Sequence, residues 1–151
     1  MINIAQIGVG YWGPNLLRNL MVNSECKVLY VSDLSKNRRD FVKDLYPSID
    51  VVDDYSIILN DSRVDAVLIS TPVASHFIIA SECLTAKKHI LVEKPMAKSV
   101  DEIDEIGRIA EKNNLIAMVG HTFLFNPAVR YVKKLILDDE LGDIRYIYSQ
   151  R

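Results

Sequence analysis

The chain has 151 residues, about the length of one domain and enough to bury a core without disulfide or metal staples. Apolar residues make up 49% and charged residues 25%, which excludes a disordered or collagen-like chain. The 18 basic and 20 acidic residues leave a net charge of −2, which argues against a nucleic-acid partner.

Cysteine usage and hydropathy indicate a cytoplasmic protein. Cys26 and Cys83 are the two cysteines, and neither stands in a metal-ligand spacing, so we expect no metal and two buried free thiols. The sequence has no signal peptide and no apolar run near the ~20 residues that span a bilayer. We therefore expect no membrane partner.

Apolar runs alternate with amphipathic segments along the chain. Strands are predicted over residues 2–7, 28–31, 50–53, 65–70, 89–93 and 115–120. Helices are predicted between and after them, with core-facing positions at helical spacing: Leu16, Leu17, Leu20 and Met21; Phe41, Val42 and Leu45; Phe77, Ile78, Ile79, Ala80 and Leu84; Ile103, Ile106 and Ala110; Val129, Val132 and Ile136.

Polar residues mark several helix starts. Ser35 and Ser75 each precede a predicted helix and are candidate caps. Ser99 and Glu102 have the spacing of a capping box, in which the Glu side chain reaches back to the N–H of the cap residue. Asn126-Pro127 starts the last helix, with proline where its missing N–H costs nothing.

The strands are mostly continuous apolar runs, which is typical of parallel strands buried on both faces. Their alternation with helices predicts an α/β fold, a Rossmann-type doubly wound parallel sheet of order 3-2-1-4-5-6, over residues 1–140. Residues 141–151 begin with a turn and continue as an alternating strand from Ile144 to Arg151. We interpret 141–151 as the first strand of a C-terminal substrate and oligomerisation domain, and we expect a homo-oligomer.

A dinucleotide-binding fingerprint lies between the first strand and the first helix. Gly8, Gly10 and Gly13 form GxGxxG around Tyr11 and Trp12. In this context the glycines allow a tight turn, backbone approach to a pyrophosphate and close packing of helix on strand. The start of the helix then offers free N–H groups to phosphate.

Asp33 lies 20 residues after Gly13, at the end of the second strand, where an acidic residue binds the adenosine ribose. Its charge repels a 2′-phosphate, which favours NAD over NADP. Leu34 and Arg38 complete this part of the predicted cofactor site, and Arg38 and Lys36 soften the repulsion.

Three strand ends supply further candidates at the same edge of the sheet. Ser70-Thr71-Pro72 ends the fourth strand and is followed by His76, Glu93-Lys94-Pro95 ends the fifth, and Gly120-His121-Thr122 ends the sixth. Ligands of open α/β sheets bind at this edge. We expect these residues to converge where a nicotinamide would lie, with a cis peptide bond at Lys94–Pro95.

The ordered motifs GVGYWG, STPVASH, VEKP and GHTFLFNPAVR, with Asp33, resemble the N-terminal domain of the Gfo/Idh/MocA family, relatives of glucose–fructose oxidoreductase and inositol dehydrogenase. The resemblance covers essentially the whole chain. It implies NAD(P)-dependent hydride transfer to or from a hydroxyl of a sugar, cyclitol or nucleotide sugar, and a C-terminal α/β domain. GYWGPN and GHTFLFNPA are most similar to the branch that oxidises the 3-hydroxyl of UDP-N-acetylated hexosamines or their uronates.

By the same resemblance, Lys94 is the catalytic lysine, whose ammonium stabilises the developing alkoxide. His121 is a second candidate for proton transfer, Glu93 orients the nicotinamide or its ribose, and His76 supports the cofactor loop. Relatives supply another acid–base residue, commonly the His of a DxxxH pattern, from the C-terminal domain, and this chain has no such pattern. The resemblance places Arg151 near the cofactor.

Two alternatives remain open at the level of sequence. One is an NADP-dependent dehydrogenase or reductase of the same family, which Asp33 disfavours. The other is a dinucleotide-dependent sensor without catalysis, which Lys94 disfavours because a sensor needs no amine beside the nicotinamide. Fold alone does not decide between them.

Overall fold

The computed structural model describes residues 1–150, and Arg151 lies outside the described residues. The chain divides into two compact units, Met1–Gly120 and a second unit that begins at His121. Each unit is described by itself.

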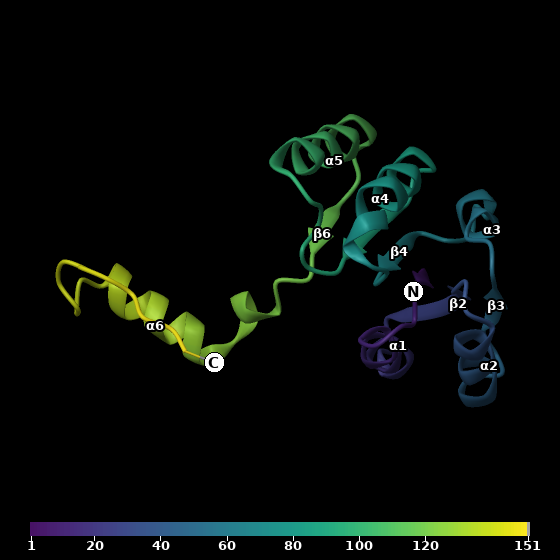
Figure 1. Cartoon of the computed structure of the whole chain (residues 1–151), viewed down its shortest axis with the longest axis horizontal. Coiled ribbons are helices and arrows are strands. Elements are labelled where there is room, and N and C mark those ends of the chain that lie inside the picture. Colours follow the sequence, from purple (N-terminus) through teal and green to yellow (C-terminus); the bar gives the residue numbers. More distant parts are fainter. Residues whose placement is uncertain (151) are drawn as a thin grey trace. The chain divides into compact units, whose positions relative to one another are not determined.

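The first unit is built on a six-stranded parallel sheet (Figure 1). Its strands are β1 (Ile2–Ile7), β2 (Cys26–Ser32), β3 (Asp50–Val52), β4 (Ala66–Ile69), β5 (His89–Val92) and β6 (Ala117–Val119). They lie in the order β3-β2-β1-β4-β5-β6, and each neighbouring pair is parallel. The predicted fold class and strand order are confirmed, with strand ends within a few residues of the predicted ones.

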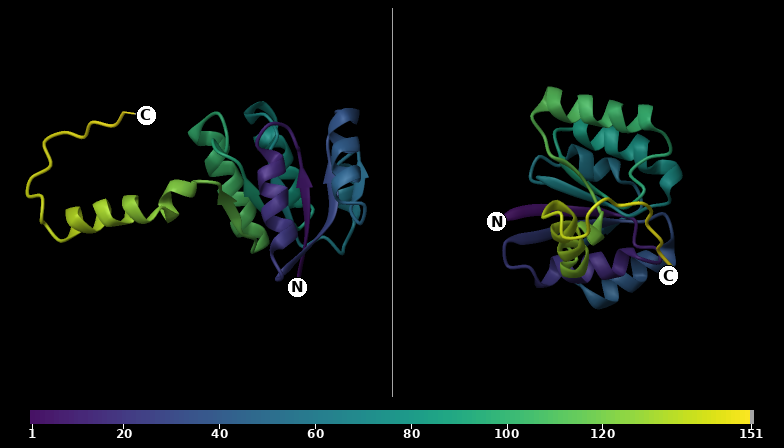
Figure 2. Two further views of the ribbon diagram at one scale, coloured as in Figure 1. Left: turned by 90° about the horizontal axis from the view of Figure 1, so that it is seen from below. Right: turned by 90° about the vertical axis from the view of Figure 1, so that its left-hand side faces the viewer.

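Helices cover both faces of this sheet (Figures 1 and 2). They are α1 (Gly13–Val22), α2 (Lys36–Leu45), α3 (Ser56–Asn60), α4 (His76–Thr85), α5 (Val100–Asn113) and the short 3₁₀ helix η1 (Val73–Ser75). Figure 1 shows α1 and α2 on one side of the strands and α4 and α5 on the other. The sequence did not predict α3, because five residues are too few to establish a helical period.

Two separate cores hold these helices to the sheet. Leu17 of α1 and Val42 of α2 are fully buried against β2 residues on one face. The larger core lies on the other face, where Ile79 and Leu84 of α4 and Ile106 of α5 are buried against β1, β4 and β5. Burial on both faces is the reason that the strands are continuously apolar.

Several predicted core positions are instead exposed. Ile103 of α5 is 43% exposed and Ile78 of α4 is 55% exposed. Both lie on well-formed helices, and Ile78 lines the pocket described below instead of facing the core. The prediction of two buried thiols was half right, because Cys83 is buried and Cys26 is only half-buried.

The capping box at the start of α5 differs from its expected form. The Ser99 hydroxyl accepts a hydrogen bond from the Glu102 N–H at 3.2 Å, as predicted. The Glu102 carboxylate accepts from the N–H of Lys98 at 2.8 Å and not from that of Ser99. Ser35 and Ser75 occupy the cap positions of α2 and α4, but neither side chain makes a capping hydrogen bond within the described residues.

The second unit contains the 3₁₀ helix η2 (Thr122–Phe125) and α6 (Pro127–Leu137). Asn126 caps α6 as predicted, since its side chain accepts from the N–H groups of Ala128 and Val129. The expectation that the apolar stripe of α6 faces a core was wrong for the described structure. The short helix η2 is the only other helix or strand within residues 121–150, and three positions of the stripe are 40–50% exposed: Val129, Val132 and Ile136.

The strand predicted from Ile144 is absent from the described residues, which carry no regular structure from 145 to 150. A strand exists only through hydrogen bonds to a neighbouring strand, and residues 121–150 contain no such neighbour. The assignment of 141–151 to a further domain stays a prediction. Among the described helices, none is long and apolar enough to cross a membrane.

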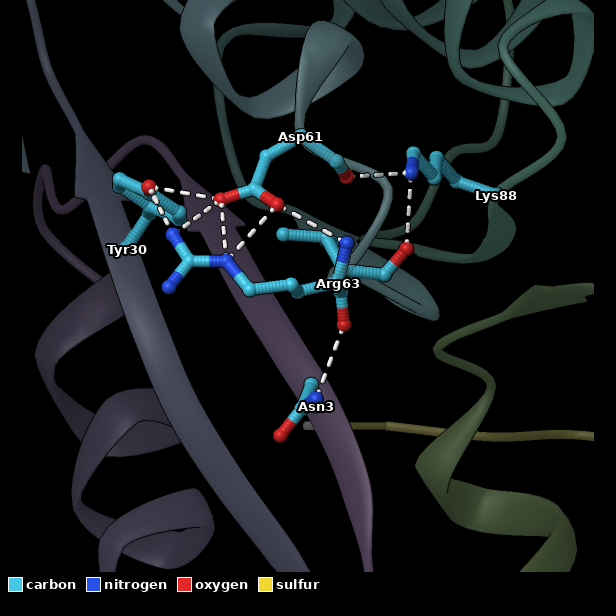
Figure 3. Close-up of polar contacts among 6 residues, drawn as sticks. Asn3, Tyr30, Asp61, Arg63 and Lys88 are labelled. Carbon is cyan, nitrogen blue, oxygen red and sulfur yellow. Dashed lines mark hydrogen bonds and ion pairs between the residues drawn. The ribbon is translucent and has the colours of Figure 1, made fainter.

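A polar network fastens the loop after α3 to the sheet (Figure 3). The Asp61 carboxylate accepts hydrogen bonds from the Arg63 guanidinium and from the Tyr30 hydroxyl, the latter at 2.8 Å. The Lys88 ammonium is buried and donates to the carbonyl of Asp61 at 2.7 Å, and Asn3 of β1 donates to the carbonyl of Arg63. The network joins β1, β2 and the chain before β5.

Candidate functional site

The strand order reverses beside β1, which has β2 on one side and β4 on the other. Because all strands are parallel, their carboxyl ends share one edge of the sheet. Gly8 follows β1, Asp33 follows β2, Ser70 follows β4 and Glu93 follows β5. Open α/β sheets bind ligands at such a switch point.

Close packing explains two of the three glycines in the turn after β1. Gly8 has a φ of +90°, and a Cβ there would lie 2.9 Å from the backbone of Ser70 and from the Thr71 side chain. A Cβ on Gly13 would lie 2.7 Å from the carbonyl oxygen of Gly8. Both distances are below those that real side chains adopt, so the turn cannot form in this shape with larger residues.

The Gln6 side chain stabilises this turn through hydrogen bonds, a role that the sequence analysis did not predict. Its side chain is fully buried, and Nε2 lies 3.0 Å from the carbonyl oxygens of Gly8 and Gly13 and 3.1 Å from Oγ of Ser70. The Ser70 hydroxyl also donates to the Gly8 carbonyl at 2.7 Å. The available signal was an amide among the apolar residues at the end of the predicted strand, since buried polar groups need partners.

Asp33 is held by the backbone on both sides. One carboxylate oxygen accepts the N–H of Val9 in the glycine turn at 2.8 Å, and the other accepts the N–H of Ser35 at 2.8 Å. Each oxygen has a second lone pair and can accept a further hydrogen bond. The carboxylate is therefore fixed in place and can still receive two hydroxyl donors.

A pocket of about 610 Å³ opens between the ends of β1, β2 and β4. Eight predicted cofactor residues line it: Gly8, Gly10, Asp33, Leu34, Arg38, Ser70, Thr71 and Pro72. Tyr55 and Ile78 also line it and were missed by the sequence analysis. The Tyr55 hydroxyl donates to Glu82 of α4 at 2.7 Å, and this bond raises the pKa of Tyr55 to about 12.

The residues of this pocket fit a dinucleotide. A Cβ placed on Gly10 would meet nothing within 4 Å, so the turn leaves open space directly above its backbone. Over the described residues, α1 has no acidic residue in its first turn and no side-chain cap. A helix start of this kind attracts the negative charge of a pyrophosphate.

Three basic residues lie near Asp33 and differ in what they contact. Arg39 donates to the carbonyl oxygens of Asp33 and Leu34 at 2.8 and 2.9 Å, and so supports the turn after β2. Lys36 pairs with Asp40 at 2.6 Å. Arg38 lines the pocket.

The Glu93-Lys94-Pro95 segment leaves β5 at the same edge of the sheet. The Lys94–Pro95 peptide bond is cis, as predicted. The Glu93 carboxylate accepts the N–H of Lys94 at 3.1 Å. The Lys94 side chain is exposed, and within residues 1–150 its ammonium has no hydrogen-bond or ion-pair partner, which leaves it free for a ligand.

His76 begins α4 and is buried, with 1% of its surface exposed. One ring nitrogen, Nδ1, lies 2.8 Å from the carbonyl oxygen of Pro95, and the other, Nε2, lies 2.7 Å from that of Thr71. The side chain therefore contacts the loops and does not line the pocket.

The remaining predicted residues are outside the pocket lining. Tyr11 and Trp12 lie in the glycine turn and are 91% and 51% exposed. His121 is the first residue of the second unit, so its proximity to Lys94 stays a prediction. Arg151 lies outside the described residues. Over the part of the chain that the structure describes, no group of three or more His, Cys, Asp or Glu side chains is arranged to hold a metal.

Comparison with known proteins agrees with this geometry. Residues 2–121 match the GFO_IDH_MocA family, described as an oxidoreductase family with an NAD-binding Rossmann fold. The chain is 30% identical to 2,7-anhydro-N-acetylneuraminate hydratase of Mediterraneibacter gnavus over 99% of its length and 39% of the relative's. It is also 30% identical to scyllo-inositol 2-dehydrogenase (NADP(+)) of Bacillus subtilis, covering 76% of this chain and 32% of that one.

Among solved structures, apo scyllo-inositol dehydrogenase from Lactobacillus casei superposes with a TM-score of 0.87 at 25% identity. The match covers 95% of this chain and 43% of that protein. The chain thus spans 32–43% of the length of these three proteins.

Proposed function

The chain belongs to the Gfo/Idh/MocA family of oxidoreductases, and from this premise we propose that it binds the cofactor of an NAD-dependent dehydrogenase acting on a sugar or cyclitol hydroxyl. The observation that carries the proposal is the pocket at the switch point, with its glycine turn on one side and Asp33 on the other. The named relatives act on an anhydro sugar acid and on an inositol, which supports a polyhydroxylated substrate.

Lys94 supplies the chemistry that the chain itself can offer to such a substrate. A nicotinamide dinucleotide, held by the glycine turn and Asp33, would supply the acceptor or donor of the hydride. Oxidation of a carbinol carbon also requires its hydroxyl to lose a proton to a general base, which by the family resemblance would come from the C-terminal domain. The free ammonium of Lys94, at the end of β5, can donate a hydrogen bond to the substrate oxygen and stabilise the negative charge that develops there. Glu93 is placed beside it and holds the Lys94 N–H.

NAD is the proposed cofactor because of the free lone pairs and the negative charge of the Asp33 carboxylate. Its oxygens retain free lone pairs for two ribose hydroxyls, and its negative charge opposes a 2′-phosphate. Arg38 on the same pocket lowers that opposition. One relative is named for NADP, so family membership does not decide the preference, and the proposal of NAD depends on Asp33.

Within the polyhydroxylated substrates, we further propose a nucleotide sugar of the UDP-N-acetylhexosamine or uronate class, oxidised at its 3-hydroxyl. Support for this class comes from the resemblance of the GYWGPN and GHTFLFNPA segments. The competing class is a free cyclitol, as in the inositol dehydrogenase relative. Turnover of UDP-N-acetylglucosamine, its uronate and scyllo-inositol by the whole protein decides between them.

Cofactor binding can be tested on this chain through its single tryptophan. Trp12 lies in the glycine turn, and its emission overlaps the absorption of dihydronicotinamide. Addition of NADH should quench Trp12 and transfer its excitation to the cofactor, and NADPH should do so only at higher concentration. Absence of saturable quenching by either, checked by titration calorimetry, would refute the proposal.

The catalytic part of the proposal is tested by Lys94→Met in the whole protein. The variant should lose turnover by a factor on the order of 10²–10³, the cost of removing one positioned stabiliser, while the Kd for NADH stays the same. Lys98→Met, an exposed lysine four residues on, is the matched control and should retain turnover. Normal kcat in the Lys94 variant would refute the catalytic role of Lys94, and absence of turnover by the wild-type protein would favour the sensor interpretation.

A further inference from the structure

His76 joins two loops that come from different strands. The Thr71–Pro72 loop follows β4, and the Glu93–Pro95 loop follows β5. The imidazole lies between them with its two nitrogens 2.7 Å from the Thr71 carbonyl oxygen and 2.8 Å from the Pro95 carbonyl oxygen. Both neighbours are carbonyl oxygens, so a hydrogen bond to each requires a proton on both ring nitrogens. The side chain is 99% buried, so water does not compete for these two contacts.

The first loop is itself attached to the glycine turn. The Thr71 side chain packs so closely on Gly8 that a Cβ there would lie 2.9 Å from it. The Ser75 hydroxyl donates to Oγ1 of Thr71 at 2.9 Å, and Ser75 lines the pocket next to it. A continuous series of contacts therefore runs from the glycine turn through Thr71 and His76 to Pro95, the residue after Lys94.

We infer that His76 is a positioning residue, which fixes the loop of Lys94 to the loop of Thr71 and so shapes the nicotinamide end of the site. The inference rests on the proposed function, because it assigns that end of the cofactor to these loops. An apolar side chain of similar size would fill the same space but would offer no donor to either carbonyl oxygen. The second attachment, to Pro95, is what places Lys94 relative to the pocket.

The contacts of the two imidazole nitrogens can be removed one at a time by substitution of His76. The amide nitrogen of an asparagine can take the place of Nδ1, and that of a glutamine can take the place of Nε2. His76→Asn can thus keep the bond to Pro95 and lose that to Thr71, and His76→Gln does the reverse. Each variant breaks the bridge while retaining a polar group that satisfies one of the carbonyls.

The test compares NADH with ADP-ribose, which lacks the nicotinamide but shares the adenosine, the pyrophosphate and the second ribose. Wild type should bind NADH more tightly than ADP-ribose by calorimetry. Both His76 variants should lose about tenfold in affinity for NADH, the factor of one buried hydrogen bond, and keep their affinity for ADP-ribose. In ¹H–¹⁵N spectra the Lys94 amide should shift and those of Val9 and Ser35 should not.

His89→Gln is the matched control, because His89 begins β5 at the opposite edge of the sheet, where its Nδ1 accepts the N–H of Ile116. It should leave both affinities unchanged. The inference is overturned if both folded His76 variants keep the wild-type ratio of affinities, if both variants unfold, or if wild type binds NADH and ADP-ribose equally. Failure of wild type to bind either ligand would instead refute the proposed function, and this inference with it.

Discussion

The carboxylate of Asp33 serves the fold and the proposed ligand with the same two oxygens. Each already accepts one backbone N–H, from Val9 or from Ser35. This fixes the glycine turn against the turn after β2, and it leaves one lone pair per oxygen for a ribose hydroxyl. A substitution that removes the negative charge of Asp33 and one that removes its acceptor oxygens should therefore affect cofactor binding differently.

Asp33→Asn should narrow the difference in affinity between NAD and NADP, because it removes the repulsion of a 2′-phosphate and retains an acceptor oxygen. Asp33→Ala should weaken binding of both, since Val9 also loses its partner. Titration calorimetry with both cofactors measures the two effects, and Asp44→Asn on the exposed face of α2 serves as the control. Tighter binding of NADPH than of NADH by wild type would contradict the assignment.

Two glycines of the turn after β1 have different expected roles: Gly13 is needed for folding and Gly10 for ligand binding. Gly13→Ala should lower the free energy of unfolding by about 1–3 kcal/mol, because its Cβ would lie 2.7 Å from the Gly8 carbonyl oxygen. Gly10→Ala should leave the unfolding free energy near that of wild type, since its Cβ meets no protein atom, and should weaken NADH binding about tenfold by occupying ligand space. Chemical denaturation measures the unfolding free energy, and Trp12 quenching measures NADH affinity. Equal stability of the Gly13→Ala and Gly10→Ala variants would refute the assignment of different roles to the two glycines.

At the scale of elements, α5 shows how a helix start is stabilised by two side chains with different targets. Ser99 accepts the N–H of Glu102, and Glu102 accepts the N–H of Lys98. Spacing alone predicts the pair of residues but not which upstream N–H the glutamate bonds. That choice depends on the backbone of the preceding turn, where Ser99 is extended at φ −142° and ψ 163°.

Ser99→Ala should lower the free energy of unfolding by about 1 kcal/mol, because one N–H at the start of α5 loses its acceptor. Gly107→Ala in the middle of the same helix should raise it by about 0.5–1 kcal/mol, since a Cβ there meets nothing within 4 Å and alanine favours the helix. Urea denaturation of both variants gives the comparison. A stable Ser99→Ala variant would show that Glu102 alone suffices.

At the scale of the whole molecule, the Asp61 network joins elements that are distant in sequence (Figure 3). Hydrogen bonds from Arg63, with a further one from Tyr30, hold the pKa of Asp61 well below its usual range. The Asp61 side chain is only 13% exposed. A carboxylate with a lowered pKa in the folded state stabilises the fold where it is ionised in both states.

Stability should therefore depend on Asp61 in a defined pH window. Its contribution is fully present above the unfolded-state pKa of about 3.9 and is lost as the pH falls toward the lower folded-state pKa. Asp61→Asn should reduce Tm at pH 7, and the difference from wild type should shrink below about pH 4. Thermal unfolding across pH measures this, with Asp104→Asn on α5 as the control; a Tm difference independent of pH would exclude the charge as its source.

The sequence by itself determined the alternation of strands and helices, the parallel sheet, the glycine turn and Asp33. These are local signals: apolar runs, helical spacing and a motif whose residues lie within one strand, turn and helix. The cap at Asn126 was also predicted from a short segment. The cis peptide bond at Lys94–Pro95 was predicted from the sharp turn after the fifth strand together with the family resemblance. Such features depend on residues that are close together in the sequence.

Only the tertiary structure decided what each of the remaining residues contacts. Gln6 bonds a serine 64 residues away, and His76 bonds the carbonyl of a proline 19 residues on, which no spacing rule predicts. The exposed stripe of α6 and the absent strand after Ile144 were mispredicted for the converse reason. Amphipathic and alternating patterns show that a face can be buried, but burial and strand formation require a partner surface, and a sequence pattern does not contain the partner.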